Sequence, residues 1–168
     1  MVKKMQLSNG NRQIALILGI AGLILLAASL GGCTKSNISD RKIEYIDLTR
    51  AVDLFEKQQK DDDTALFIDT RKPERFAQGH ITGAINMRTP DIDLRYGTDP
   101  ELERYKSLII YGENPGSANT HAMAKRMIEA GYNSFMKKRV TVFLGGWREW
   151  EITGLPIEED EPTNAGDE

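Results

Sequence analysis

Short apolar runs alternate with segments of helical periodicity, and this alternation limits the chain to few folds. The runs Ala65–Ile68, Leu108–Tyr111 and Val140–Leu144 contain no charged residue, as is typical of strands covered on both faces. Apolar residues at helical spacing occur in Leu48–Phe55 and Thr120–Ala130. Strands that alternate with helices form parallel sheets, because each crossover helix packs on the sheet. The sequence therefore predicts an α/β fold, with a central parallel sheet and helices on both faces.

Local signals mark the ends of the two helices. Asp47 precedes the first helical segment as a predicted N-cap, and Gly131 follows the second as a predicted C-cap. The residues expected on the buried faces are Leu48, Ala51, Val52 and Phe55 in the first helix, and Met123, Met127 and Ile128 in the second.

The N-terminus has the composition of a targeting segment. Three basic residues and no acidic ones precede the apolar run Ile14–Leu30, and small residues then lead to Cys33, the only cysteine of the chain. This order is similar to that of a bacterial lipoprotein signal. We expect cleavage before Cys33, a thioether-linked diacylglycerol on its sulfur, and a fatty acid such as palmitate on its amine. The alternative is an uncleaved membrane helix, and both place residues 34–168 outside the cytoplasm.

A lipid on Cys33 predicts a location in the cell envelope, with the membrane as the first partner. Several acyl chains give durable anchoring, where a single chain gives only marginal binding. Thr34 follows Cys33 in place of the aspartate associated with inner-membrane retention. In a bacterium with two membranes we therefore expect the periplasmic face of the outer membrane, and otherwise the outer face of the cell membrane.

Charge and composition divide the chain into four expected parts. These are a signal peptide (residues 1–32), the lipidated cysteine and a polar tether (residues 33–43), a folded domain (residues 44–158) and an acidic, disordered tail (residues 159–168). Cleavage would remove three positive charges and shift the formal net charge from −3 to about −6. Nucleic acid is therefore not an expected partner. One cysteine forms no disulfide within the chain.

Several motifs in the folded part resemble a known family. Asp69–Arg71 ends a predicted strand and precedes Gly79–Asn86, while Leu144–Trp150 precedes Gly154–Pro156. These stretches resemble the Asp-x-Arg, Gly-His-Ile-x-Gly-Ala-x-Asn and Leu-x-Gly-Gly-x-x-x-Trp elements of rhodanese-like sulfurtransferases, over roughly residues 44–158. The resemblance implies a five-stranded parallel sheet with helices on both faces. It also implies an active loop between a central strand and the following helix.

The predicted active loop departs from the family pattern. The resemblance implies a nucleophilic cysteine directly after the strand, and this chain has Gly112 at that position. Asn119 stands where an arginine is implied, and the loop is about two residues longer than usual. Sulfur transfer requires a thiolate that attacks, holds and releases a sulfane sulfur. The sequence therefore predicts a rhodanese-like domain that lacks sulfurtransferase catalysis and has no catalytic residue.

The alternative function is an active sulfurtransferase in which another group replaces the missing thiol. Three such groups can be considered. Ser117 or Thr120 could act as a nucleophile if Glu113 or His121 served as general base. Cys33 could reach the loop, because its tether extends roughly 30 to 35 Å, but lipidation would remove its thiolate. A cysteine of a partner protein is the third source.

A loop without a nucleophile can still bind an anion through backbone N–H groups at the start of a helix. The candidate residues are Gly112, Glu113, Asn114, Gly116, Ser117, Asn119 and Thr120. The competing interpretation is a solvated connector, because glycine and proline commonly mark turns. We therefore expect a module that binds a protein partner or a small oxyanion such as sulfate, sulfite or phosphate.

Three residues are expected to support the loop. Asp69 and Arg71 are predicted to form an ion pair, and His80 is predicted to fix a turn by hydrogen bonding. No cofactor is implied. The two histidines are far apart in sequence and the single cysteine is expected to be lipidated, so no metal-ligand spacing exists.

Overall fold

The computed structural model describes residues 38–94 and 97–160. Cys33, the predicted signal peptide and residues 161–168 lie outside the described residues, so the expectations for them stay predictions. No described helix combines the length and the apolar character that a membrane span needs.

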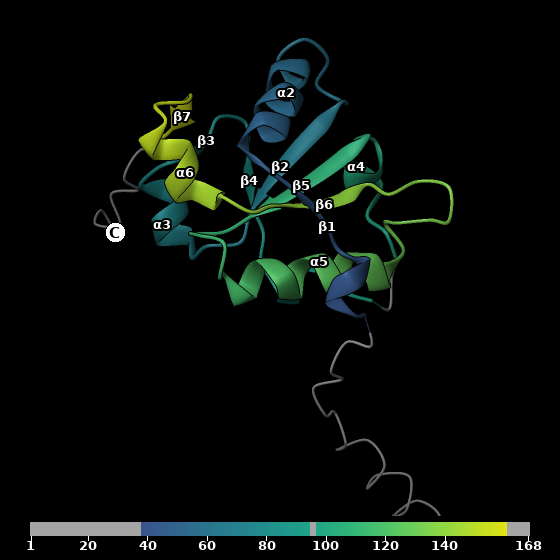
Figure 1. Cartoon of the computed structure of the whole chain (residues 1–168). Helices are drawn as coiled ribbons and strands as arrows, with labels where there is room; N and C mark the ends of the chain where they lie inside the picture. The colour runs from purple at the N-terminus through teal and green to yellow at the C-terminus, as the bar shows by residue number, and fades with distance from the viewer. Residues whose placement is uncertain (1–37, 95–96, 161–168) are drawn as a thin grey trace, which may run out of the picture. The chain divides into compact units, whose positions relative to one another are not determined.

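The core of the domain is a five-stranded parallel sheet, as predicted (Figure 1). Across the sheet the strands are β1 (Glu44–Ile46), β6 (Val140–Phe143), β5 (Ser107–Tyr111), β2 (Ala65–Asp69) and β4 (Ile85–Asn86). The pairing β2–β5 aligns Leu66 with Leu108, and β5–β6 aligns Leu108 with Val140. The predicted runs became β2, β5 and β6, and every residue of β2 and β6 is buried.

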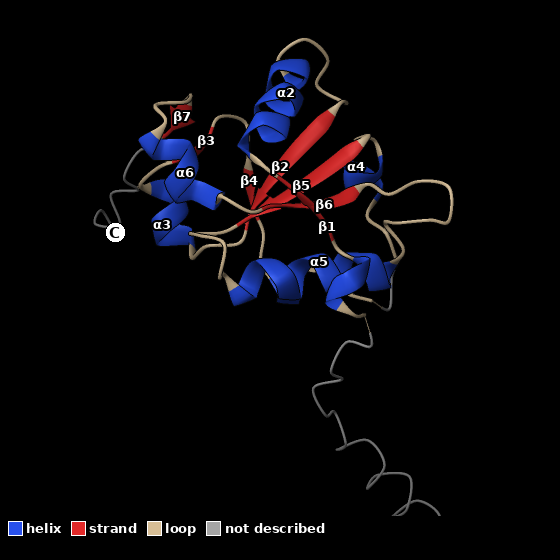
Figure 2. Cartoon of the chain, in the orientation of Figure 1, coloured by secondary structure: helices blue, strands red, loops and turns tan. Residues whose placement is uncertain are grey.

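Helices cover both faces of the sheet (Figure 2). They are α2 (Leu48–Gln58), α3 (Pro73–Ala77), α4 (Pro100–Glu103), α5 (Ala118–Ala130) and α6 (Gly146–Ile152), with short 3-10 turns η1 (Asp40–Lys42) and η2 (Thr89–Asp91). A separate antiparallel pair joins β3 (His80–Ile81) to β7 (Ile157–Glu158). The predicted α/β architecture is confirmed.

Alternate strand residues build two cores, because successive side chains of a strand point to opposite faces. On one face, Leu66 and Ile110 pack with Met123 and Met127 of α5. On the other face, Phe67 packs with residues of α2 and α6, which include Phe55 and Trp150. Figures 1 and 2 show α2 and α5 on opposite sides of the sheet.

The helix ends follow the expected capping chemistry. The Asp47 carboxylate accepts a hydrogen bond from the Arg50 N–H at 2.9 Å and caps α2. Gly131 ends α5 in the left-handed conformation, with φ 103°. The helix α5 begins at Ala118, two residues before the predicted start at Thr120, because the extended residue Ser117 already serves as its N-cap.

Part of the segment expected to be a tether is folded onto the domain. The turn η1 occupies residues 40–42, and Ile43 is buried in the core on the α5 face. The Asp40 carboxylate pairs with Lys125 of α5 at 2.8 Å. This contact fixes the point at which the N-terminal segment joins the domain.

Candidate functional site

The loop after the central strand β5 is held in place by the start of α6. This β5–α5 loop comprises residues 112–117. The Trp147 N–H donates to the Gly112 carbonyl at 2.8 Å, and the Arg148 N–H donates to the Glu113 carbonyl at 3.1 Å. The first backbone donors of α6 are therefore satisfied by the loop, and the loop is fixed against α6.

Gly112 lies in a space that its neighbours have filled. It is buried and directly follows β5. A Cβ atom built on Gly112 would lie 2.5 Å from Ser117 Oγ and 2.8 Å from Ser117 Cβ, and would overlap Thr120 Oγ1. The hydroxyl-bearing side chains at the start of α5 thus occupy the volume that a side chain at residue 112 would need.

The Thr120 hydroxyl is fixed by a buried hydrogen-bond chain. Thr70 Oγ1 donates to the Tyr111 carbonyl at 3.0 Å and lies 3.1 Å from Thr120 Oγ1. Both threonines are buried. Moving Thr120 away from Gly112 would break this chain, so the close packing at Gly112 is part of the core of the domain.

Two N–H groups of the loop are engaged inside the loop itself. The Gly116 N–H donates to Asn114 Oδ1 at 3.0 Å, and the Ser117 N–H donates to the Asn114 carbonyl at 3.1 Å. Pro115 carries no N–H. Asn114 therefore takes up the donors that an anion bound at the centre of the loop would use.

The candidate bases face other groups. His121 Nδ1 lies 3.0 Å from the Ser117 carbonyl, and the Glu113 carboxylate lies 3.6 Å from Arg71 Nη1. Neither contact reaches the hydroxyl of Ser117 or Thr120. The geometry therefore gives no support to activation of either hydroxyl as a nucleophile.

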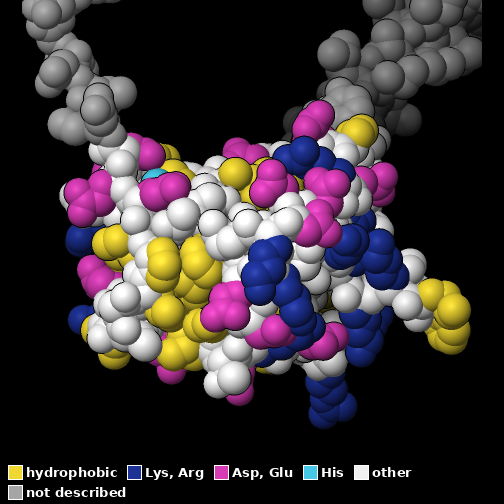
Figure 3. Space-filling view, turned by 90° about the horizontal axis from the view of Figure 1, so that it is seen from above, with side chains coloured by type: hydrophobic (Ala, Val, Ile, Leu, Met, Phe, Trp, Pro, Cys, Tyr) yellow, Lys and Arg dark blue, Asp and Glu magenta, His cyan; other side chains and the backbone are white. Residues whose placement is uncertain are grey.

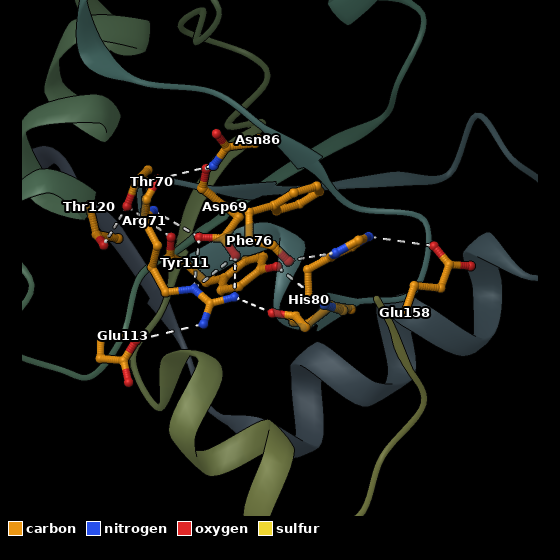
Figure 4. Close-up of polar contacts among 12 residues, drawn as sticks. Asp69, Thr70, Arg71, Phe76, His80, Asn86, Tyr111, Glu113, Thr120 and Glu158 are labelled. Atoms are coloured by element: carbon orange, nitrogen blue, oxygen red, sulfur yellow. Dashed lines mark hydrogen bonds and ion pairs between the residues drawn. The ribbon is translucent and has the colours of Figure 1, made fainter. Parts of the chain in front are cut away.

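Arg71 is the centre of a buried polar network beside the loop (Figure 4). Its Nε and Nη2 donate to the Asp69 carboxylate at 3.0 and 2.8 Å, and Nη2 also donates to the Gly79 carbonyl at 2.6 Å. The guanidinium stacks on Trp147 at 4.4 Å from the ring centroid. Only Nη1 is left to face Glu113, which is 48% exposed. This last nitrogen is the part of Arg71 available to a ligand.

A polar pocket of about 330 Å³ opens at Arg71. It is lined by Arg71, Arg75, Gln78, Gly79, Glu113, Trp147, Arg148 and Glu151. Three arginines and two glutamates therefore converge at one place, from α3, α6 and two strand ends. Of the residues predicted for the loop, only Glu113 lines this pocket. Sequence reasoning missed Arg75 and Arg148, which no motif marked.

Asn119 lies away from the arginine pocket. It is exposed in the first turn of α5 and lines a smaller hollow of about 110 Å³ with Thr70, Arg88, Thr89 and Pro90. Glu113 and Asn119 therefore line different pockets, and Asn114 lines a third one. Anion binding at these residues stays a prediction.

His80 and Asn86 hold the backbone on either side of the site by hydrogen bonds. His80 is 3% exposed, stacks on Phe76 at 3.7 Å between ring centroids, and has Nδ1 3.0 Å from the Phe76 carbonyl. Its Nε2 lies 3.6 Å from the Glu158 carboxylate. Asn86 donates to the carbonyls at both ends of the strand exit, residues 69 and 71. These bonds fix the turn between α3 and β3 and the exit of β2 (Figure 4).

Tyr111 links the site to the antiparallel pair. Its hydroxyl accepts a hydrogen bond from the Ile81 N–H at 3.2 Å. Burial, and then the nearby Asp69 carboxylate, raise the pKa of Tyr111 well above its ordinary range. Tyr111 therefore stays protonated at neutral pH and serves as a structural hydrogen-bonding group.

Comparisons with known proteins agree with this fold. The family profile described as Rhodanese-like domain matches residues 51–153. The uncharacterized protein BU052 of Buchnera aphidicola is 33% identical over 95 residues, which cover 56% of this chain and 61% of that relative. The uncharacterized protein YibN of Escherichia coli K12 is 28% identical over 141 residues, 84% of this chain and 89% of YibN.

A solved structure shows the same architecture. The solution structure of the rhodanese-like domain of the Anabaena protein Alr3790 has a TM-score of 0.50 and 23% identity, and the match covers 74% of this chain and 86% of that one. At this identity the likeness concerns the fold alone. Because the family profile matches more than half of the sequence and the described fold is the one it implies, the chain belongs to the rhodanese-like domain family.

Proposed function

We propose that this protein is a membrane-anchored rhodanese-like module of the cell envelope that binds an anionic partner and does not transfer sulfur. The observation that carries the proposal is the filled space at Gly112. The residue after the central strand has no side chain, and Ser117 and Thr120 occupy the volume where a nucleophile would stand. A persulfide relay without a thiolate at this place has no step in which sulfur is held.

The proposed anchor rests on the N-terminal sequence. The run Ile14–Leu30 and the small residues before Cys33 have the order of a lipoprotein signal. Lipidation would convert the only thiol of the chain into a thioether. The same modification would therefore attach the protein to the membrane and remove its last sulfur nucleophile.

The proposed binding site is the arginine pocket at Arg71. Arg71 Nη1 has a carboxylate partner only at 3.6 Å, and that partner, Glu113, is half-exposed. Arg75 and Arg148 line the same pocket. An oxyanion, or a carboxylate on a partner protein, would replace Glu113 and gain charge-assisted hydrogen bonds from guanidinium groups.

The absence of sulfur transfer is tested by thiosulfate and cyanide turnover. The full chain in detergent is expected to produce thiocyanate at the rate of the protein-free control, because the site holds no thiolate. A Cys33→Ser variant, which removes the only cysteine and with it the proposed lipid anchor, shows whether any turnover depends on Cys33. Turnover above the control rate, whether or not it is lost in the Cys33→Ser variant, would contradict the proposal.

Anion binding is tested by titration with sulfite, sulfate and phosphate. Trp147 stacks on Arg71 and lines the pocket, so its fluorescence should change as the anion binds. A Glu113→Gln variant is expected to bind several-fold more tightly, because the competing carboxylate is removed. Glu56→Gln, an exposed charge in α2, should leave the affinity unchanged. Equal affinities for all three proteins would show that the anion does not bind beside Glu113.

A further inference from the structure

The loop between α5 and β6 presents two apolar side chains directly to solvent. Phe135 is 101% exposed and Met136 is 90% exposed, the highest values among the large hydrophobic residues that the structure describes. The loop projects from the molecule in Figure 1, and Figure 3 shows a hydrophobic projection that stands clear of the surface. Exposed apolar groups that gather at one place mark contact sites for proteins or membranes.

The projection is held out by a defined framework. The Ser134 N–H donates to the Lys137 carbonyl at 2.9 Å and the Lys137 N–H donates back at 3.3 Å, so Phe135 and Met136 form the tip of a closed turn. Asn133 Oδ1 accepts from the N–H groups of Arg139 and Val140, where the loop meets β6, at 2.8 and 2.9 Å. The tip is thus presented by its own hydrogen bonds.

The base of this loop is clamped to the domain. The buried Arg139 guanidinium donates to the carbonyls of Leu102 at 3.0 Å and Glu103 at 2.7 Å, and to that of Tyr105. The Arg139 guanidinium therefore binds three carbonyls at and just after the end of α4. The fixed base keeps the tip away from the rest of the surface.

The charge beside the tip is positive although the chain is acidic. Lys137 and Lys138 follow the tip, are exposed, and form no ion pair with a described residue. Figure 3 shows Lys and Arg side chains near the hydrophobic projection. The formal net charge of the whole chain is −3. An apolar tip with flanking ammonium groups complements the acyl boundary and the anionic headgroups of a bilayer.

The loop lies near the point where the N-terminal segment joins the domain. Asp40 pairs with Lys125 at 2.8 Å, and α5 continues only to Ala130, about 8 Å further along its axis. The projecting loop follows this helix, and its turn begins at Asn133, after Gly131 and Tyr132. Six residues separate Cys33 from Asp40, so a lipid on Cys33 would leave the loop within reach of the same membrane.

We propose that Phe135 and Met136 insert into the interface of an anionic bilayer while Lys137 and Lys138 bind its headgroups. The loop then sets the orientation of the domain on the membrane that anchors it. This inference rests on the proposed membrane anchor, whereas the charge and exposure of the loop are independent of it.

The test uses the full chain reconstituted into phosphatidylglycerol-containing vesicles, with and without bromine on the acyl chains. A Phe135→Trp variant adds one emitting group to the background of Trp147 and Trp150, which are buried. We expect brominated lipid to quench the added emission. The matched control is Ile152→Trp, because Ile152 is an apolar residue that is 81% exposed. It lies in α6, and α6 packs on the face of the sheet opposite to α5. The emission of this control variant should not be quenched.

Two further measurements separate the outcomes. Lys137→Glu combined with Lys138→Glu should reduce the quenching at residue 135, because the headgroup contacts are lost. Flotation with the vesicles reports the anchor. A chain that floats but is quenched no more at residue 135 than at residue 152 overturns the loop proposal and leaves the anchor intact. A chain that does not float with the vesicles overturns both the loop proposal and the proposed anchor. Emission at residue 135 that is blue-shifted but insensitive to bromine would assign the tip to a protein contact, which also overturns the proposal.

Discussion

Replacing Gly112 with cysteine is expected to lower the free energy of unfolding by about 1–3 kcal/mol and to give no thiosulfate turnover. A side chain at this position meets Ser117 Cβ at 2.8 Å and overlaps the Thr120 hydroxyl. Thr120 is held by its hydrogen bond to Thr70, so displacing Thr120 breaks that bond and destabilises the fold. Denaturant unfolding, followed by the fluorescence of the two buried tryptophans, measures the loss.

Two variants separate crowding from sulfur chemistry. Gly112→Ala carries the same Cβ without a thiol and should lose a similar amount of stability. Adding Ser117→Gly and Thr120→Ala to Gly112→Cys removes the crowding. The triple variant should therefore regain most of the lost stability. Turnover should still be absent, because Asn114 continues to engage the donors of the loop. A Gly112→Cys variant as stable as the native chain, or one that transfers sulfur, would contradict this account of the loop.

Replacing Arg71 with alanine is expected to cost about 3–5 kcal/mol of unfolding free energy. Asp69 is fully buried, and its carboxylate receives hydrogen bonds from Nε and Nη2 of the Arg71 guanidinium. Without Arg71 the carboxylate keeps its burial and loses its counter-charge. The Gly79 carbonyl and the Trp147 ring lose their partner as well. Thermal or denaturant unfolding of the full chain measures the effect.

An exposed ion pair gives the matched control. Arg50 pairs with Asp53 in α2, and the two side chains are 53% and 41% exposed. Arg50→Ala should cost less than about 1 kcal/mol. Losses of equal size in the Arg71→Ala and Arg50→Ala variants would show that burial does not set the strength of the Asp69–Arg71 pair.

The sheet could be predicted from sequence where its strands are buried on both faces. β2, β5 and β6 appear as continuous apolar runs because α2 and α6 cover one face and α5 the other. The edge strands leave no such signal. β1 has three residues, two of them exposed, and β4 has two residues that are only partly buried. Their place in the sheet depends on pairing with a neighbour, which periodicity does not report.

The site was predictable only in part. The Asp69–Arg71 pair follows from two residues that end one strand, and the structure places the pair as the motif implied. The arginine pocket depends on α3 and α6 meeting in space, which the spacing of Arg75 and Arg148 does not show. The filled space at Gly112 could not be predicted from sequence either, because Ser117 and Thr120 are ordinary polar residues for a helix start.

No residue of this chain is expected to hold a sulfane sulfur. This expectation is checked by the intact mass of the full chain, purified from membranes and incubated with thiosulfate, before and after treatment with a reductant. The two masses are expected to be the same. A one-sulfur addition that the reductant removes, mapped to Cys33 or to residues 112–120, would contradict it.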